Sequence, residues 1–330
     1  MPRILIVKTS SLGDVVHNCP AVADIARHVP GAVIDWVVEE PFAEVVALHR
    51  AVRRVIPVAV RRWRGALGYA STWSELAALR RLLRSEPYDH VIDSQGLVKS
   101  ALIGWMARGL RHGFDRESAR ERFAAHFYDA RHAVPTGLHA VERNRRLAAA
   151  ALGYAVEEGC DYGLSAADSL PIEVREPASI PYALFLTMTS RDDKLWPEEQ
   201  WRALGAKLGA HGIRCLLPWG SEEEKRRCAR IAVAIPGAVV PRRLKLAELA
   251  SVARKARVVV GVDTGLAHLA AALDVPVVGL YCGSDPALTG LYPDGLYQGG
   301  VQGGKRGRNL GNAGSPPTVA EVIEALEPVL

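Results

Sequence analysis

The sequence lacks the two features that would direct this chain of 330 residues into or across a membrane. No apolar run approaches the ~20 residues that a membrane-spanning helix requires. The first residues also lack the basic and then apolar layout of a signal peptide, since their apolar part is only Ile4 to Val7. We therefore expect the chain to begin near Met1 and to be cytoplasmic.

Paired cysteines are missing as well. The five cysteines are odd in number, widely scattered and include no CxxC pair. This spacing favours neither a disulfide framework nor a zinc site. We expect reduced cysteines that serve in packing, and no bound metal.

Two nucleotide-binding signatures are absent. The turn after the first expected strand, residues 3–8, has only Gly13, whereas the dinucleotide-binding fingerprint has three glycines. An NAD site of the Rossmann type is therefore not expected there. The arginine clusters of the chain are not accompanied by a basic and aromatic RNA-binding signature or a helix-turn-helix pattern. We expect no nucleic-acid partner.

The composition is that of a globular protein, and its excess of basic residues is unevenly distributed along the chain. Hydrophobic residues make up 49% and charged residues 23% of a chain that is long enough for two α/β domains. Residues 1–165 hold 22 Lys and Arg against 18 Asp and Glu, whereas the remainder holds 19 against 18. An anionic partner is therefore expected on the N-terminal half.

The clearest local pattern lies between residues 258 and 286. A β-branched run is followed by the turn Asp263-Thr264-Gly265, a short apolar segment and a second apolar run, which is typical of a βαβ unit. Ligands of parallel sheets bind beyond the carboxyl ends of the strands, where N–H groups at a helix N-terminus suit phosphate oxygens. This turn is therefore the first candidate site.

The rest of the chain fits two such α/β lobes facing each other across a cleft. Prolines, glycines and acids without a sustained period place the linker within residues 155–181, so we expect domains at 1–165 and 166–315. Residues 109–136 are interpreted as a mobile excursion from the first domain, and 299–314 as a surface loop. The closing helix, 316–330, is expected to pack back on the first domain.

Asp14 lies where the first helix begins, directly after the first strand. Two interpretations fit this position. As an N-cap, the carboxylate accepts a hydrogen bond from a free backbone N–H and complements the helix dipole. As a general base, it faces the cleft at the carboxyl end of the strand. His17, one turn later, fits a partly buried polar residue better than a second catalytic group.

Two further charged segments each permit two interpretations. Arg61, Arg62 and Arg64 surround a tryptophan, and they suit either phosphate and carboxylate groups of a substrate or a solvated basic face. The amphipathic helix that follows is suited to rest on a membrane surface. Three glutamates, 222–224, begin a later helix, where they either favour its N-terminus or hold ribose hydroxyls.

Several motifs carry a family resemblance that spans most of the chain. They are VKTSSLGDVVH (7–17), RVIPVAVRRWR (54–64), DSQGLVKSA (93–101), TSRDDKLWPEEQW (189–201), LPWG (217–220) and VDTGLAHLAAALDVP (262–276). Together they resemble the ADP-heptose:lipopolysaccharide heptosyltransferases of glycosyltransferase family 9, and among these the type that adds the first heptose. The resemblance implies the GT-B fold, with an acceptor-binding N-terminal lobe and a nucleotide-sugar-binding C-terminal lobe.

The reaction that the resemblance implies is the transfer of L-glycero-D-manno-heptose from ADP-heptose to the inner Kdo of Kdo2-lipid A. The transfer would invert the anomeric centre and need neither metal nor cofactor, with Asp14 as the catalytic base. Because the acceptor is a membrane lipid, the enzyme is expected to be peripheral at the cytoplasmic face of the inner membrane.

The resemblance also implies a set of binding residues. Lys194 would lie against the diphosphate, where an ammonium can neutralise charge on the leaving group. The other donor residues would be Thr189, Ser190, Glu224, Leu244, Asp263, Thr264, Gly265 and His268, with Glu224 and Leu244 near ribose and adenine. The acceptor residues would be Ser10, Arg61, Arg62, Arg64 and Arg120, whose guanidinium groups suit Kdo carboxylates and lipid A phosphates.

Two other functions remain open from the sequence. One is a related transferase that adds the second heptose or another sugar, although the TSSLGD and RRWR segments favour the first-heptose type. The other is a non-catalytic protein of the same fold that binds nucleotide or lipid A. The presence of both Asp14 and Lys194 argues against a mere binding protein.

Overall fold

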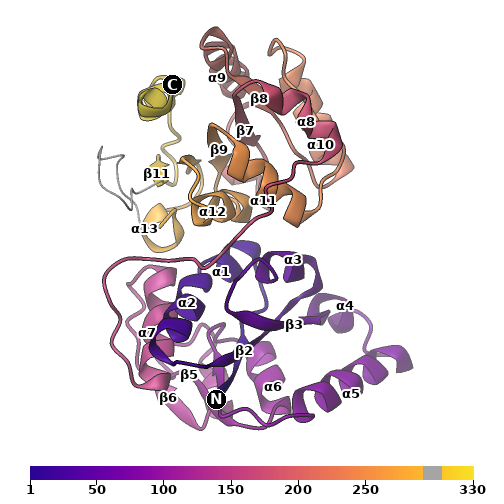
Figure 1. The fold of residues 1–330 in the computed structure, drawn as a ribbon, viewed down its shortest axis with the longest axis vertical. Coiled ribbons are helices and arrows are strands. Elements are labelled where there is room, and N and C mark those ends of the chain that lie inside the picture. The colour runs from indigo at the N-terminus through magenta and orange to yellow at the C-terminus, as the bar shows by residue number, and fades with distance from the viewer. Residues whose placement is uncertain (293–306) are drawn as a thin grey trace. The chain divides into compact units, whose positions relative to one another are not determined.

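The computed structural model describes residues 1–292 and 307–330, and the chain divides into two compact units, Met1–Leu164 and Ser165–Leu330 (Figure 1). The division falls inside the expected linker, one residue from the expected boundary. Each unit contains one parallel sheet with helices packed against it. The predicted α/β class with two parallel sheets is confirmed.

The first sheet has six strands in the order β3-β2-β1-β4-β5-β6. These are β1 (Arg3–Val7), β2 (Val33–Glu39), β3 (Val52–Val58), β4 (His90–Asp93), β5 (Leu110–Phe114) and β6 (Ala130–His132). The central strands read as short apolar runs because both of their faces are covered. The order is that of a doubly wound sheet, and it reverses between β1 and β4.

Helices cover this sheet on both faces. They are α1 (Leu12–Val16), α2 (Cys19–His28), α3 (Ala43–Val46), α4 (Val60–Arg64), α5 (Ala70–Arg84), α6 (Val98–Met106) and α7 (Ala140–Leu152), with 3-10 turns η1 (Glu40–Phe42) and η2 (Arg122–Phe127). On one face, Trp63, Leu79 and Ile103 bring α4, α5 and α6 onto the strands. On the other face, α2 and α7 pack against each other (Figure 1).

The expected excursion at residues 109–136 is wrong in one respect, because it contributes β5, η2 and β6 to the first unit. These strands were not expected because their sequence is polar.

A row of histidine rings crosses the sheet: His90 Nδ1 lies 3.0 Å from His112 Nε2, and His112 Nδ1 lies 3.1 Å from His132 Nε2. Burial, with the two neighbouring rings, lowers the pKa of His112 to about 4, so this ring is neutral at pH 7.

The second sheet has five strands in the order β11-β10-β9-β7-β8. These are β7 (Tyr182–Leu186), β8 (Arg214–Leu216), β9 (Val258–Val262), β10 (Val277–Leu280) and β11 (Gly307–Leu310). Beyond β8, a single parallel bridge joins Val239 to Leu216. Counted from this bridge, the order repeats that of the first sheet, and it reverses between β7 and β9.

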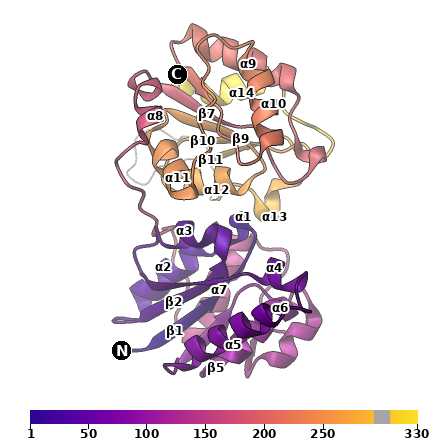
Figure 2. The same cartoon turned by 90° about the vertical axis from the view of Figure 1, so that its right-hand side faces the viewer.

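The helices of the second unit are α8 (Ile172–Arg175), α9 (Glu198–Ala210), α10 (Glu222–Ala232), α11 (Leu246–Lys255), α12 (Gly265–Ala272), α13 (Pro286–Thr289) and α14 (Val319–Leu326). Three 3-10 turns are η3 (Pro177–Ser179), η4 (Asp192–Lys194) and η5 (Glu327–Val329). In Figure 2, α9, α10 and α14 lie together near one end of this unit, and α11 and α12 lie near the other.

The closing helix corrects one expectation, since α14 belongs to the second unit and not to the first. It contacts α9, β10 and β11. Its apolar side chains Val322, Ala325 and Leu326 are fully buried in the core of the second unit. Burial of this stripe accounts for the helix without any partner from the N-terminal half.

The expected surface loop at 299–314 is corrected in part. Its residues 299–306 lie outside the described residues, whereas Gly307–Leu310 forms β11, which pairs in parallel with β10. A Cβ atom at Gly307 would lie 2.9 Å from the Cβ atom of Leu291. Gly307 therefore lets this strand approach its neighbours closely.

Candidate functional site

Three of the candidate residues, Asp14, Lys194 and Asp263, lie where the strand order of their sheets reverses. In the first unit, the loops that follow β1 and β4 carry Asp14 and Gln95. In the second unit, the loops that follow β7 and β9 carry Lys194 and Asp263. Ligands of doubly wound sheets bind at this point, because the two loops diverge and leave a crevice beyond the strand ends.

Asp263 is the centre of the site in the second unit. Its Oδ2 accepts a hydrogen bond of 2.6 Å from Lys194 Nζ, and Thr189 Oγ1 donates to its backbone oxygen at 2.7 Å. His268 Nε2 lies 3.8 Å from Oδ1. Four residues that the sequence selected as donor-binding are therefore brought together at one strand end.

The surroundings of Asp263 keep it ionised. Burial alone would raise the pKa of this carboxyl, but hydrogen bonds from His268, Lys194 and Ser284 outweigh it and hold the pKa well below its usual range. The Lys194 side chain is 18% exposed, so the ammonium is fixed in place while one side reaches solvent. A fixed cation of this kind can bind a diphosphate.

Ser284 is a member of this group that the sequence analysis did not select. Its Oγ donates to Asp263 Oδ2 at 2.6 Å. The neighbouring Gly283 lies close to the segment that carries Lys194, since a Cβ atom there would lie 2.5 Å from the backbone oxygen of Asp193. The signal available in the sequence was the turn after the second run of the βαβ unit, at the same sheet edge as Asp263.

The helix that follows Asp263 offers backbone donors. Thr264 is the N-cap of α12, and Gly265 is its first residue. The N–H groups of a first helical turn have no carbonyl partner within the helix, and the helix dipole makes this end positive. The turn 263–265 thus combines a fixed ammonium with helix-terminal N–H groups, which together suit phosphate oxygens.

The remaining donor candidates lie on separate loops. Ser190 follows Thr189 and is exposed, and Leu244 is buried just before α11. Glu224 is the third residue of α10, where its Oε2 accepts hydrogen bonds from Gly220 N at 2.5 Å and Ser221 N at 3.3 Å. The capping role considered for these glutamates is therefore present in the structure. Contact with ribose stays a prediction.

In the first unit, Asp14 is the third residue of α1, and Ser11 is the N-cap. The Asp14 Oδ2 accepts hydrogen bonds from Ser11 N at 2.8 Å and from Ser11 Oγ at 3.1 Å. Arg120 Nη1 lies 3.7 Å from the same oxygen, and the Asp14 side chain is 26% exposed. Asp14 thus completes a capping box instead of acting as the N-cap, and it stays accessible to a substrate.

Two buried side chains that were not selected from the sequence, those of Lys8 and Gln95, support this loop. The Lys8 ammonium donates to Ser94 O at 2.7 Å, and burial lowers its pKa. The Gln95 Oε1 accepts hydrogen bonds from the backbone N of Thr9 at 3.0 Å and of Ser10 at 3.2 Å. These contacts tie the loop after β1 to the loop after β4, so Asp14 lies on a braced segment.

Asp93 in turn holds the loop that carries Gln95. Its carboxylate accepts hydrogen bonds from Gln95 N at 2.9 Å, Ser100 Oγ at 2.8 Å and the Tyr128 hydroxyl at 2.7 Å. Burial raises the pKa of Asp93, and these donors oppose the rise. The bond from Tyr128 was not readable from the sequence, because Tyr128 and Asp93 are 35 residues apart in the chain.

The acceptor arginines have different surroundings. The Arg62 guanidinium makes two 2.9 Å bonds to Glu75, and Arg61 lies over the ring of Phe42 at 5.7 Å from its centroid. Arg64 and Arg120 are exposed. Ser10 is buried. Only Arg120 is placed beside Asp14 by a contact within the described residues.

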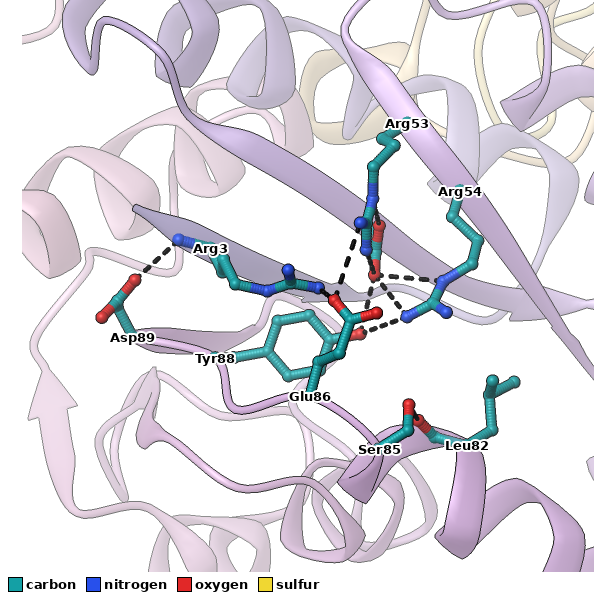
Figure 3. Close-up of polar contacts among 9 residues, drawn as sticks. Arg3, Arg53, Arg54, Leu82, Ser85, Glu86, Tyr88 and Asp89 are labelled. Carbon is teal, nitrogen blue, oxygen red and sulfur yellow. Dashed lines mark hydrogen bonds and ion pairs between the residues drawn. The ribbon is translucent and has the colours of Figure 1, made fainter. Parts of the chain in front are cut away.

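Part of the basic cluster in the N-terminal half neutralises a buried acid. Figure 3 shows Arg53 and Arg54 converging near Tyr88. Both guanidinium groups contact Asp35 Oδ2 at 2.7 Å, and the Tyr88 hydroxyl donates to the same oxygen at 2.8 Å. Asp35 lies in the first half of β2, away from the carboxyl edge of the sheet. These two arginines are therefore structural.

The ion pairs of Asp35 with Arg53 and Arg54 should make the folded protein less stable in acid and in a variant without the Asp35 carboxylate. Burial raises the pKa of the Asp35 carboxyl, but the bonds from Arg53, Tyr88 and Arg54 lower it overall, so its contribution is present at neutral pH and is lost as pH falls below about 4. We expect Asp35→Ala to decrease the free energy of unfolding. The decrease should lie near the lower end of the range of roughly 3–5 kcal/mol for a broken buried ion pair, since both arginines are partly exposed. Urea denaturation measures this change in the free energy of unfolding. An unchanged urea midpoint in Asp35→Ala would contradict the structural role of the two arginines.

Residues 1–292 and 307–330 contain no group of three or more His, Cys, Asp and Glu side chains that could hold a metal ion. The expectation that no metal takes part remains a prediction.

Comparisons with known proteins agree with this arrangement. The model of glycosyltransferase family 9 (heptosyltransferase) matches residues 76–304. The chain is 47% identical over 292 residues to lipopolysaccharide heptosyltransferase 1 of Salmonella typhimurium, covering 88% of this chain and 91% of that one.

Two solved structures are also similar. E. coli heptosyltransferase WaaC with ADP superposes with a TM-score of 0.88 at 42% identity, over 99% of this chain and 100% of that one. The same enzyme with ADP-2-deoxy-2-fluoro heptose gives a TM-score of 0.83 at 41% identity, over the same shares of the two chains. The likeness of the whole chain to these structures confirms the expected GT-B type of fold.

Proposed function

The chain belongs to glycosyltransferase family 9, the heptosyltransferases, and we propose that it transfers L-glycero-D-manno-heptose from ADP-heptose to the inner Kdo of Kdo2-lipid A in lipopolysaccharide core synthesis. The observation that carries the proposal is the Lys194 and Asp263 ion pair beside the N-terminus of α12, at the point where the second sheet reverses. This is a fixed cation beside helix-terminal N–H groups, which is the chemistry that a sugar nucleotide requires.

The donor is supported by the relatives as well as by the site. The similar E. coli enzyme was solved with ADP and with a fluorinated ADP-heptose, and this chain matches both structures over almost its whole length. Lys194 would lie against the diphosphate, with Thr189, Ser190, Thr264, Gly265 and His268 around the phosphates and sugar. Glu224 and Leu244 would meet ribose and adenine.

Transfer then needs one base and one leaving group. Asp14 takes the proton of the acceptor hydroxyl while that oxygen attacks the anomeric carbon. The bond between the anomeric carbon and the diphosphate oxygen breaks on the opposite face, and ADP leaves with the electron pair. Lys194 neutralises the charge that gathers on the diphosphate. A single displacement inverts the anomeric configuration, and an ammonium performs the role that a metal ion has in other transferases.

The acceptor is an anionic lipid, which suits the first unit. Ser10, Arg61, Arg62, Arg64 and Arg120 would meet its carboxylates and phosphates. Because Arg62 is paired with Glu75, it would have to exchange this partner for the acceptor. An acceptor anchored in a bilayer also requires a peripheral enzyme at the cytoplasmic face of the inner membrane.

Purified protein incubated with ADP-heptose and Kdo2-lipid A tests the proposal. We expect ADP release that depends on the acceptor and persists in EDTA, and a product whose new linkage has the inverted configuration by NMR. Absence of ADP release would reject the proposed reaction. An acceptor that already carries one heptose is the matched control, and turnover on this acceptor alone would favour the second-heptose transferase instead.

A further inference from the structure

Lys8 is a buried cation to which the proposed reaction assigns no step. It directly follows β1, and only 5% of the residue is exposed. Its ammonium contacts two neutral oxygens, Ser94 O at 2.7 Å and Asn144 Oδ1 at 3.4 Å, and it forms no ion pair in the described part of the chain. Burying an ammonium without a carboxylate partner is costly, and an apolar side chain of similar length would avoid this cost. A charge kept at such a place indicates a role beyond packing.

The contacts of Lys8 extend to the end of α1, the helix that carries the proposed base. Asn144 of α7 also donates, through Nδ2, to the backbone oxygen of His17 at 3.1 Å, and His17 is the C-cap of α1. Ser94, whose backbone oxygen accepts from Lys8, donates through Oγ to Asn18 Oδ1 at 2.7 Å. The ammonium thus lies where α7 and the loop after β4 both hold the last turn of α1.

Four charged groups act on Lys8 through space. Burial has the largest effect and lowers the pKa of the ammonium, whereas the carboxylates of Asp14 and Asp93 oppose this change, and Arg120 and Arg143 add to it. These groups come from α1, β4, the segment before η2 and α7. Because the attraction between opposite charges is mutual, the ammonium of Lys8 also favours the ionised form of the Asp14 carboxyl.

We propose that Lys8 is a positioning residue for Asp14: its buried ammonium holds the segment that carries the carboxylate and favours the ionised form that can take a proton. The inference rests on the proposed function, because Asp14 is the base of that reaction. The proposed acceptor is anionic, and its negative groups would disfavour a carboxylate beside them. The exposed Arg120 is accessible to these groups, whereas the ammonium of Lys8 is enclosed by protein and stays with Asp14.

Lys8→Met tests this assignment, since methionine has nearly the length of lysine but has neither the charge nor the N–H donors. We expect kcat to fall by about 10²-fold, the cost of a misplaced reacting group. ADP affinity should be unchanged, because the donor residues belong to the second unit. Loss of a positive charge near a carboxylate favours its protonated form, so the acid limb of the pH profile of kcat should move to higher pH. Lys8→Arg keeps the charge and should keep the acid limb of the parent protein.

The pH profile needs a matched control. Two other titratable side chains, His17 and His139, lie at the contact of α1 with α7, with ring centroids 5.3 Å apart. Both are present in the parent protein and in the Lys8 variants, so a difference between the profiles reports Lys8. Arg145→Met is the control variant, because it removes a buried cation of α7 that is paired with Asp24 at 2.7 Å. It should lower the midpoint of thermal unfolding and leave kcat and the acid limb unchanged.

Lys8→Gln keeps the proposal testable if Lys8→Met does not fold, because its amide can still donate a hydrogen bond while the charge is lost. The acid limb should move to higher pH in this variant as well. A folded Lys8→Met or Lys8→Gln protein with the acid limb of the parent would overturn the proposal, whether or not kcat falls, since a merely structural role would not move this limb. A parent protein without acceptor-dependent ADP release would instead reject the reaction itself, so the two failures are distinguishable.

Discussion

Asp14→Asn should lower kcat by about 10²–10⁴-fold, the range that a general base contributes, while the affinity for ADP changes little. The amide has the size of the carboxylate and can still accept the hydrogen bond from Ser11 N, but it cannot take a proton. Asp14 belongs to the first unit, whereas the donor residues belong to the second. Single-turnover transfer with saturating donor and acceptor measures the loss, and calorimetry measures ADP affinity.

The control for this variant is Glu321→Gln. Glu321 has the same capping-box position in α14, where its Oε2 accepts hydrogen bonds from Thr318 N at 2.7 Å and Thr318 Oγ1 at 2.8 Å. The Glu321→Gln variant shows what a weakened capping box alone does to turnover, because Glu321 does not lie in a loop at the carboxyl end of a strand. We expect it to keep full turnover. If Asp14→Asn transferred heptose as fast as Glu321→Gln, the base assignment would be lost.

Lys194→Gln should have the second largest effect, and it should change both binding and chemistry. Removing one fixed donor at a developing charge costs about 10²–10³-fold in kcat. It also leaves the Asp263 carboxylate near the diphosphate without its cation, since Lys194 Nζ lies 2.6 Å from Asp263 Oδ2 in the structure. ADP affinity should therefore fall as well, in contrast to Asp14→Asn. Calorimetry with ADP and single-turnover kinetics separate the two effects.

Lys194→Arg and Lys255→Gln serve as comparisons. The arginine variant keeps the charge and should recover part of the ADP affinity. Lys255 also forms a Lys–Asp ion pair, at 3.3 Å from an exposed Asp168, but lies at the end of α11 away from the turn 263–265. Its loss should leave binding and turnover unchanged. Equal behaviour of Lys194→Gln and Lys255→Gln would remove Lys194 from the site.

The sequence predicted the sheets where local pattern and fold agree. Apolar β-branched runs such as Val258–Val262 are typical of strands that are buried on both faces of a parallel sheet. The turns that follow these runs mark the ends of the strands. It missed β5 and β6, because His112 and His132 stabilise those strands through contacts between strands and not through an apolar run. It misplaced the closing helix, because an apolar stripe does not say which surface it will cover.

The candidate site also contains residues that the sequence indicated and residues that it did not. Asp263 was selected because it follows a strand at the edge where ligands bind, whereas Lys194 was selected only through the family resemblance. Ser284, Gln95 and Lys8 were not, because their roles depend on contacts with residues from other loops. The roles of Arg53 and Arg54 were also hidden, since basic residues look alike in sequence whether they await a ligand or neutralise a buried acid.

The most direct test of the account is a crystal structure of this chain with ADP-2-deoxy-2-fluoro heptose. We predict the diphosphate within hydrogen-bond distance of the Lys194 ammonium and of the first N–H groups of α12, with the anomeric carbon facing the Asp14 carboxylate. A diphosphate bound at the loop after β1, or an Asp14 side chain that points away from the anomeric carbon in the complex, would contradict the account.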